Sequence, residues 1–113
     1  MNIAVTEEYL RIVHIAPEGR IDAFSVASLR EKFDDLLNEE VERFIVDLSE
    51  TTFLDSAGMA ALVSLLKRAR QAGGDVMLVW PKLEAAQRIL KLTKFDKVFT
   101  MLDKADDAIV FAG

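Results

Sequence analysis

The residues with the clearest chemical potential are Asp55 and Ser56, a carboxylate followed directly by a hydroxyl. Apolar residues follow them at the i, i+3, i+4 and i+7 spacing of one helix face: Met59, Leu62, Val63 and Leu66. This spacing places Ser56 in the first turn of a helix. A hydroxyl there, beside a carboxylate, is either a plain helix cap or a site of covalent modification. The two roles are compatible, and either Asp55 or Ser56 is suited to the cap.

The chain lacks the groups that would let a serine act as a nucleophile. A serine hydroxyl needs a general base that is oriented by a third group, and the only histidine, His14, belongs to a distant predicted strand. The G-x-S-x-G pattern of a nucleophile elbow is absent, because Leu54 occupies the position of its first glycine. We therefore predict that the protein is not an enzyme, and that any base acting on Ser56 comes from another protein.

Cofactor and metal sites have no motif in this sequence. The five glycines form neither a GxGxxG nor a GxxxxGK[ST] pattern, which argues against a dinucleotide site or a P-loop. With no cysteine and one histidine, a zinc site would depend on carboxylates. Three aspartates near predicted strand ends could converge on one rim of a sheet, with a Mg²⁺ site as a minor alternative: Asp22, Asp47 and Asp55. We predict neither a cofactor nor a metal.

Composition excludes several classes of partner. The net charge of −5 argues against a nucleic-acid binder, since phosphate contacts need clustered lysine and arginine. The densest basic group lies late on the helix that starts at Ser56, and it either complements the helix C-terminus or forms a docking patch: Lys67, Arg68 and Arg70. No apolar run approaches the roughly 20 residues of a membrane span, and residues 1–4 lack signal-peptide features. We expect a globular, cytoplasmic protein.

Hydrophobic periodicity predicts five strands and four helices in one domain over residues 1–113. The strands are expected at residues 3–5, 9–15, 44–48, 76–80 and 98–99, with a hairpin turn at residues 6–8. The helices are expected at residues 25–38 and 56–71, after Pro81 as a first helical residue, and at residues 103–111. A capping-box pattern also allows the first helix to start three residues later, at Ser28. Residues 21–24 and the polar stretch after residue 48 are expected to be connections.

The order of these elements predicts an α/β fold. The first two strands form an antiparallel hairpin, whereas the later strands are joined by helices, as parallel neighbours require. Residues 44–48 and 76–80 are apolar without alternation, which is typical of strands buried on both faces. The prediction is one mixed, mostly parallel sheet of about five strands with about four helices covering it.

Three segments resemble the signature of STAS domains, specifically of the bacterial anti-sigma factor antagonists. The first comprises residues 46–49 (Val-Asp-Leu-Ser) and residues 53–59 (Phe-Leu-Asp-Ser-Ala-Gly-Met). The second, residues 18–23 (Glu-Gly-Arg-Ile-Asp-Ala), resembles the Gly-x-(Ile/Leu)-Asp element that follows the second strand in that family. The third, residues 88–99, resembles the third helix and closing segment. Together the segments span essentially the whole chain in the expected order.

The resemblance implies a regulatory switch without catalysis of its own. In this family the unphosphorylated antagonist binds an anti-sigma factor, which is also a GHKL-type serine kinase using ATP, and so frees the sigma factor. Phosphorylation of the serine after the motif aspartate breaks that complex, and a PP2C-type phosphatase restores it. Carried onto this chain, the phosphoacceptor is Ser56. The implied partner-binding residues are Asp22, Asp55, Ser56, Ala57, Gly58 and Met59.

Three residues, at two places in the motif, depart from the commonest family pattern. Ala57 stands where serine or threonine is usual, which leaves Ser56 as the only candidate acceptor within the motif. Met59 and Ala60 replace a Leu-Gly pair, and methionine nearly conserves the volume of leucine. These departures therefore concern how a kinase recognises the loop. The family also contains transport components, so the alternative role is a subunit of a lipid-transport complex or a domain of an anion transporter.

Overall fold

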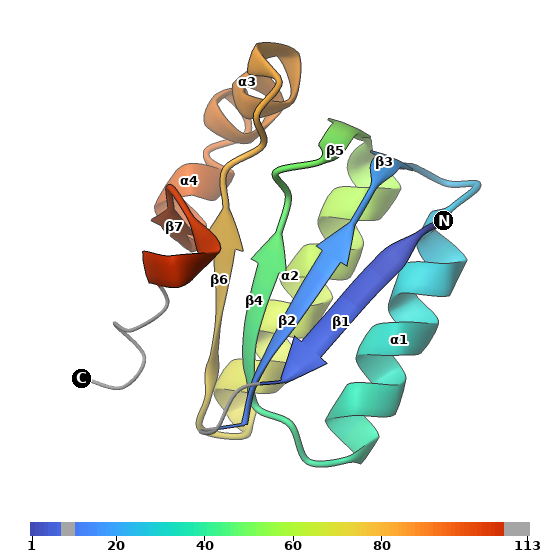
Figure 1. The fold of residues 1–113 in the computed structure, drawn as a ribbon, viewed down its shortest axis with the longest axis vertical. Helices are drawn as coiled ribbons and strands as arrows, with labels where there is room; N and C mark the ends of the chain where they lie inside the picture. Colours follow the sequence, from blue (N-terminus) through green and yellow to red (C-terminus); the bar gives the residue numbers. More distant parts are fainter. Residues whose placement is uncertain (8–10, 108–113) are drawn as a thin grey trace.

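The computed structural model describes residues 1–7 and 11–107 of the chain. The elements of this part are shown in Figure 1. In chain order they are β1 (Ile3–Glu7), β2 (Ile12–Pro17), β3 (Gly19–Ile21), α1 (Val26–Asn38), β4 (Arg43–Asp47), β5 (Thr51–Leu54), α2 (Ser56–Gln71), β6 (Asp75–Val79), α3 (Glu84–Leu92), α4 (Phe95–Val98) and β7 (Thr100–Leu102). Residues 8–10 of the predicted hairpin and residues 108–111 of the predicted closing helix lie outside the described part.

Five strands form one mixed sheet in the order β1-β2-β4-β6-β7 (Figure 1). β1 pairs with β2 antiparallel, with Val5 opposite Ile15, and all other neighbours are parallel. Helices α1 and α2 provide the long crossover connections that parallel strands need. The predicted α/β fold, with a mostly parallel five-stranded sheet and four helices, is therefore confirmed in the part of the chain that the structure describes.

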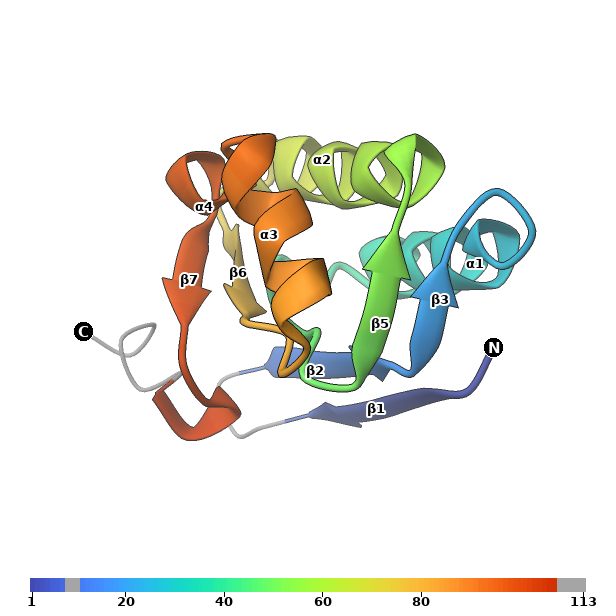
Figure 2. The same cartoon turned by 90° about the horizontal axis from the view of Figure 1, so that it is seen from above.

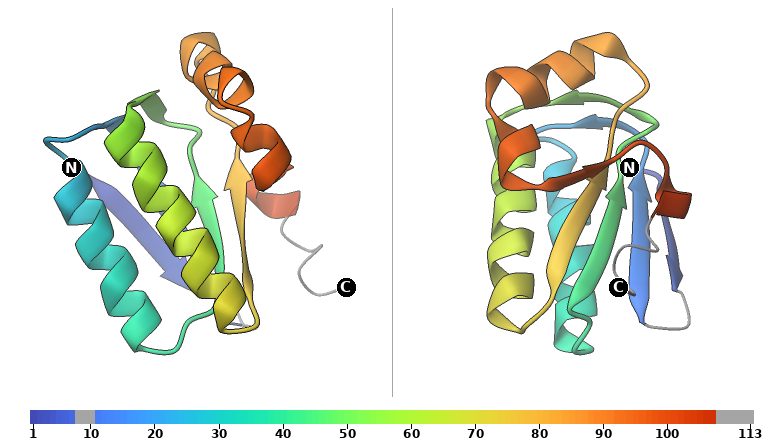
Figure 3. Two further views of the ribbon diagram at one scale, coloured as in Figure 1. Left: turned by 180° about the vertical axis from the view of Figure 1, so that it is seen from behind. Right: turned by 90° about the vertical axis from the view of Figure 1, so that its left-hand side faces the viewer.

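The core of the molecule lies on both faces of the central strands β4 and β6, whose unbroken apolar sequences are buried as predicted. Helices α1 and α2 lie side by side on one face (Figure 3) and share a buried cluster with that face, including Leu29, Leu62, Phe44 and Val46. A smaller cluster on the opposite face holds Ile12, Ile45, Met77, Val79 and Leu102. None of the described helices has the length and apolar character needed to span a membrane.

Helix α1 starts and helix α2 ends where the serine and glycine residues of the sequence predict. Ser25 is the residue before α1, which confirms the earlier of the two predicted starts. A start at Ser28 is wrong because the first turn already packs the buried side chain of Val26 into the core. Helix α2 spans the predicted residues and ends just before Gly73, whose φ of +94° favours glycine.

Two short strands that the sequence did not predict form a second, separate sheet in which β3 and β5 are parallel. β5 lies in the stretch after residue 48 that was expected to be a connection, and β3 ends at Ile21, the first residue of the other expected connection. They are strands because Ile21 and Leu54 are buried in the main core, which holds the two segments side by side. Figure 2 shows this small sheet leading from the edge of the main sheet toward the starts of α1 and α2. It is the part of the fold that positions the candidate site.

The structure also corrects a predicted turn and a predicted helix start. Thr6 and Glu7 belong to β1 rather than to a hairpin turn, because they pair with residues of β2. Pro81 is not a first helical residue: Leu83 is still extended, and α3 begins at Glu84. Pro81 is buried, and its carbonyl accepts a hydrogen bond from the side chain of Gln87, so it forms the turn that leads into the helix.

The closing segment differs from the prediction as well. The strand expected at residues 98–99 lies two residues later, where Thr100 of β7 pairs with Met77 of β6. The preceding residues form the short helix α4 instead, after a turn in which Lys94 has a left-handed φ of 63°. Of the helix expected at residues 103–111, the described part contains a 3₁₀ turn at residues 105–107.

Candidate functional site

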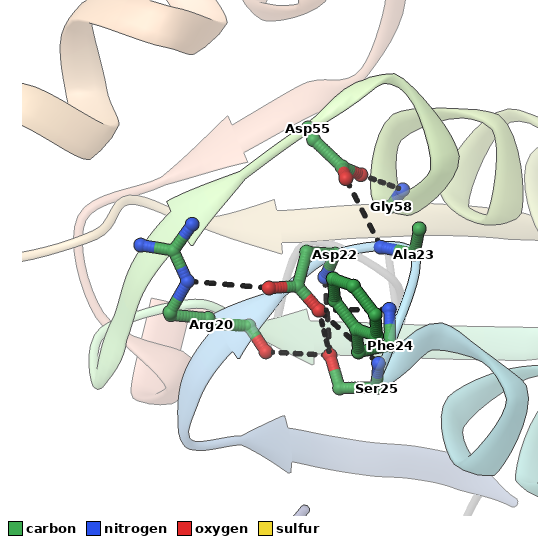
Figure 4. A network of polar contacts seen from close by, with 7 residues as sticks. All are labelled: Arg20, Asp22, Ala23, Phe24, Ser25, Asp55 and Gly58. Atoms are coloured by element: carbon green, nitrogen blue, oxygen red, sulfur yellow. Dashed lines mark hydrogen bonds and ion pairs between the residues drawn. The ribbon is translucent and has the colours of Figure 1, made fainter.

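The N-terminus of α2 is capped by Asp55. Its backbone is extended (φ −102°, ψ −173°), and its Oδ1 accepts a hydrogen bond of 3.0 Å from the N–H of Gly58. This bond satisfies one of the free donors at the start of the helix. Oδ2 accepts a second bond of 3.0 Å from the N–H of Ala23, in the loop after β3 (Figure 4). Of the two residues suited to the cap, Asp55 therefore forms it.

Ser56 is the first residue of α2 and is exposed to solvent. Both carboxylate oxygens of the neighbouring Asp55 accept backbone hydrogen bonds, so this carboxylate is not oriented as a base toward the hydroxyl. His14 lies on β2 of the main sheet. The arrangement presents a reachable hydroxyl to the active site of another protein, without a base poised on it.

The loop between β3 and α1 is built around the carboxylate of Asp22 (Figure 4). Oδ1 accepts hydrogen bonds from the N–H groups of Phe24 and Ser25 at 3.0 and 3.1 Å, and Oδ2 lies 3.2 Å from Nε of Arg20. The Ser25 hydroxyl also donates to the carbonyl of Arg20 at 2.7 Å. Partial burial alone would raise the pKa of Asp22, but the hydrogen bonds from Arg20, Phe24 and Ser25 together lower that pKa below its ordinary value. The ionised carboxylate thus fixes the loop at neutral pH.

The small sheet brings this loop and the cap of α2 together. Ile21 pairs with Leu54 at the ends of β3 and β5, and the N–H of Asp55 donates to the Ile21 carbonyl at 3.2 Å. Gly58 allows α2 to approach this point, because a Cβ there would lie 2.5 Å from the Ile21 carbonyl oxygen and 2.8 Å from its Cγ2. Gly58 is buried. It therefore shapes the predicted partner-binding surface through packing.

The remaining predicted partner-binding residues, Ala57 and Met59, are half-buried and pack against the main core. Met59 also lines a hollow that starts at Ser56 on the outer flank of α2. The structure thus places Ser56 at a boundary, with the Asp22 loop on one side and an apolar hollow on the other.

The three aspartates do not all meet at this site. Asp22 and Asp55 are joined through the loop that contains Ala23. Asp47 is outside this network, and its Oδ1 accepts a hydrogen bond from the N–H of Ser49 instead. Among residues 1–7 and 11–107, no group of three or more acidic, histidine or cysteine side chains is placed to hold a metal ion.

Three residues of this surface escaped the sequence prediction. Phe24 is 97% exposed, although its backbone is fixed by Asp22. The exposed ring is available to a binding partner, and a phenylalanine in a predicted connection was the available signal. The guanidinium of Arg20 lies 4.1 Å from the ring centroid of Phe53, a cation–π contact that links β3 to β5. That contact had no sequence signal, because the two strands themselves were not predicted.

Comparison with known sequences identifies the family. The model of the STAS domain family matches residues 4–108 of the chain. A Thermotoga maritima protein that carries the name of an anti-sigma factor antagonist is 31% identical over 77 residues, which cover 68% of this chain and 67% of that protein.

Solved structures show the same fold. The crystal structure of an anti-sigma factor antagonist from Mycobacterium paratuberculosis matches with a TM-score of 0.84 and 23% identity, covering 96% of this chain and 91% of that one. The anti-sigma factor antagonist SpoIIAA matches in its unphosphorylated form with a TM-score of 0.75 and 18% identity, covering 96% and 94% of the two chains. The phosphorylated form of SpoIIAA from Bacillus matches with a TM-score of 0.75 and 15% identity, covering 99% and 100%. The chain belongs to the STAS domain family.

Proposed function

We propose that this STAS protein is a cytoplasmic anti-sigma factor antagonist that is switched off by phosphorylation of Ser56. The observation that carries the proposal is the exposed hydroxyl at the first residue of α2, between the capping carboxylate of Asp55 and the fixed loop of Asp22. In the proposed cycle the unphosphorylated protein binds an anti-sigma factor, which is also a GHKL-type serine kinase, and thereby frees the sigma factor. The kinase transfers the γ-phosphoryl group of ATP to Ser56 Oγ, and a PP2C-type phosphatase hydrolyses the phosphoserine.

The antagonist role is supported by the names of the related proteins. The T. maritima relative and the M. paratuberculosis structure are both named as anti-sigma factor antagonists. SpoIIAA is described in an unphosphorylated and a phosphorylated form, and this chain matches both with the same TM-score of 0.75. This agreement supports a switch in which phosphorylation leaves the topology of the fold unchanged.

The site also supports a role as a substrate rather than as a catalyst. Asp55 uses both carboxylate oxygens to hold backbone N–H groups, one in α2 and one in the Asp22 loop. A base that removes the proton of Ser56 therefore has to come from the kinase. The hydrogen bonds of Asp55 in turn fix the backbone on both sides of Ser56, so that a kinase meets its hydroxyl on an ordered helix start.

Electrostatics explain how the phosphoryl group would act. It adds about −1.5 to −2 charges at neutral pH, and the N-terminus of a helix stabilises negative charge by roughly 0.3–1 kcal/mol. The isolated fold should therefore tolerate phosphoserine at position 56. In a complex the same charge is desolvated beside Asp55 and Asp22, and like charges in an interface cost on the order of several kcal/mol. The modification thus weakens binding without unfolding the protein.

The proposal is tested by purifying each GHKL-type kinase of the source organism and incubating it with ATP and this protein. Intact-mass analysis should show one added phosphoryl group on the wild type and none on Ser56→Ala. Ser28→Ala, which removes an exposed hydroxyl from α1, is the matched control and should be labelled like the wild type. Equal labelling of Ser56→Ala would refute the assignment of the acceptor. Co-purification with a transport ATPase, together with no labelling by any kinase, would favour the transport role instead.

A further inference from the structure

Strand β1 forms one edge of the five-stranded sheet and pairs with β2 on one side only. In the right-hand view of Figure 3 it lies at the rim of the molecule, and no other described strand or helix lies beyond it. Its five residues are half-buried or exposed, and Val5 is 38% exposed. The backbone at this edge is therefore open to a further strand.

The hydrogen bonds to β2 decide which backbone groups of β1 face outward. The N–H of Glu18 donates to the carbonyl of Asn2 at 3.0 Å, so these two residues form a hydrogen-bonded pair. Hydrogen-bonded and non-hydrogen-bonded pairs alternate along antiparallel strands, which makes Ile3, Val5 and Glu7 the non-hydrogen-bonded positions toward β2. The residue opposite Ile3 is a proline, which has no N–H to offer. The N–H and carbonyl groups of these three residues thus point away from the sheet.

The sequence of β1 lacks the features that usually protect an exposed edge. Natural edge strands are blunted by proline, by lysine, by a β-bulge or by very short length. Strand β1 contains neither proline nor lysine, and its register with β2 runs without a bulge over five residues. The opposite edge of the sheet, β7, has only three residues. Strand β1 is thus the edge at which a further strand would extend the sheet.

A second copy of β1 fits this edge in one symmetric register. If the two strands run antiparallel with Val5 at the two-fold axis, Val5 lies opposite the copy's Val5, and Ile3 lies opposite the copy's Glu7. All three outward-facing residues of each chain then form hydrogen-bonded pairs. A shift of two residues places one of them opposite a residue outside β1. The proposed register also brings no like charges together, because Glu7 is the only charged residue of β1.

The side chains favour the same pairing. Val5 is opposite Ile15 and so lies on the face of the sheet that α1 and α2 cover, where its exposed part would contact the copy's Val5. Cross-strand pairs of β-branched residues stabilise neighbouring strands. On the other face the register sets Ala4 opposite the copy's Thr6, and both of these small side chains are exposed.

We propose that β1 pairs antiparallel with β1 of a second copy of this chain and joins the two five-stranded sheets into one continuous sheet. The same strand serves both copies, so the assembly closes as a two-fold symmetric dimer. Pairing of β1 with the copy's β7 would be head-to-tail and would use a shorter edge. The interface involves neither Ser56 nor Asp22, so it does not depend on the proposed function.

Sedimentation equilibrium on the protein alone, from about 1 µM to about 1 mM, should show a reversible equilibrium between monomer and dimer. Val5→Pro removes an outward-facing N–H and leaves the hydrogen bonds to β2 intact, a position at which edge strands tolerate proline. It should raise the dissociation constant of the dimer by about tenfold or more, because each copy loses one hydrogen bond between the strands. A wild type that stays monomeric over this range would overturn the proposal, as would a Val5→Pro variant that dimerises like the wild type.

Val5→Thr is the matched control for the proline variant. Threonine keeps the N–H and the β-branched shape of valine, so this variant should dimerise like the wild type. Circular dichroism and thermal unfolding should show that both variants keep the wild-type fold. A loss of the dimer in Val5→Thr as large as that in Val5→Pro would mean that the copies are not joined through the backbone of β1, and would also overturn the proposal.

A cross-linking experiment tests the register and does not need the proline variant to fold. The chain has no cysteine, so Val5→Cys and Thr6→Cys each introduce a single thiol. In the proposed register the two Cα atoms at position 5 are about 5.5 Å apart, within reach of a disulfide, whereas those at position 6 are diagonal neighbours about 7–8 Å apart. With oxidised glutathione as the oxidant, Val5→Cys should form disulfide-linked dimers at least about tenfold faster than Thr6→Cys. Equal rates, or faster linkage through position 6, would overturn the proposal.

Discussion

The two sheets of this molecule are held together by different forces. The central strands of the five-stranded sheet are buried on both faces and contribute Phe44, Ile45, Val46 and Leu78, each 0% exposed. The two-stranded sheet has three and four residues per strand, and the loop and cap at its end are fixed by hydrogen bonds to the carboxylates of Asp22 and Asp55. Hydrophobic burial dominates the first sheet, and polar contacts dominate the edge of the second.

This division separates stability from function. The candidate phosphoacceptor and both aspartates lie at the end of the small sheet, away from the strands that supply most of the buried area. A site of this kind can change its charge and its partner while the main core stays intact. Substitutions in the main sheet should therefore mainly lower the free energy of unfolding, whereas substitutions at the end of the small sheet should mainly change binding and phosphorylation.

The largest effect is expected in the main sheet. Phe44→Ala should lower the free energy of unfolding by about 3–5 kcal/mol, because it removes a fully buried aromatic ring and leaves a cavity. Urea titration measures the loss. Under conditions where the variant is still folded, a kinase should phosphorylate Ser56 at the wild-type rate. A much slower rate in the folded variant would contradict the separation between the two regions.

A smaller loss, centred on the site, is expected from Gly58→Ala. The added Cβ would lie 2.5 Å from the Ile21 carbonyl oxygen, so α2 and β3 have to move apart at a cost of about 1–3 kcal/mol. Hydrogen exchange should show faster exchange at the N–H of Asp55, which pairs with that carbonyl. Ala60→Gly, an exposed change on the same helix, is the control and should cost only the helix propensity of about 1 kcal/mol. Unchanged exchange at Asp55 in Gly58→Ala would disprove the close-approach role of Gly58.

The cap of α2 predicts a difference between two substitutions at one position. Asp55→Ala removes the acceptors for the N–H groups of Gly58 and Ala23 and should cost about 0.5–2 kcal/mol in urea titrations. Asp55→Asn keeps the oxygen that accepts from Gly58 but loses the acceptor for Ala23, because an amide nitrogen only donates. It should therefore cost less than Asp55→Ala, while removing the negative charge next to Ser56. In the partner complex, phosphorylation should then weaken binding less in Asp55→Asn than in the wild type. A free energy of unfolding for Asp55→Ala equal to that of the wild type would mean that the cap contributes nothing.

The smallest effect concerns pH. Hydrogen bonds lower the pKa of Asp22 in the folded protein, so its stabilising contribution is present above the unfolded pKa of about 3.9 and is lost as the pH falls through the lower folded value. Asp22→Asn cannot titrate, and its free energy of unfolding should fall less steeply below about pH 4 than that of the wild type. Glu31→Gln, an exposed change on α1, is the charge-matched control. If the free energy of unfolding of Asp22→Asn falls with decreasing pH as steeply as that of the wild type, the hydrogen-bond network around Asp22 is contradicted.

The same division explains which parts of the fold could be predicted from the sequence. Strand β4 and helix α2 were predictable, because an unbroken apolar run and a 3.6-residue stripe are strong local signals. Strands β3 and β5 were not, because their short segments mix exposed and buried residues, and only their mutual pairing and the burial of Ile21 and Leu54 make them strands.

Prediction of the candidate site from the sequence is limited in the same way, because it too depends on contacts between distant residues. The place of Ser56 at the start of a helix was predictable, because the apolar periodicity that follows it is local information. The hydrogen bond from the N–H of Ala23 to Asp55 joins residues that are 32 positions apart in the sequence. It depends on the small sheet, so no local pattern indicates it. The exposure of Phe24 likewise depends on which surfaces the folded chain leaves uncovered.

The central claim is that one phosphoryl group on Ser56 changes binding but not folding. The most direct test is calorimetric titration of the anti-sigma factor with the unphosphorylated and the Ser56-phosphorylated protein, alongside thermal unfolding of both forms. A loss of about 4 kcal/mol of binding free energy corresponds to an affinity roughly 1,000-fold lower, and we predict a loss of this size with nearly unchanged melting temperatures. Equal affinities, or a phosphorylated form that unfolds, would contradict the account.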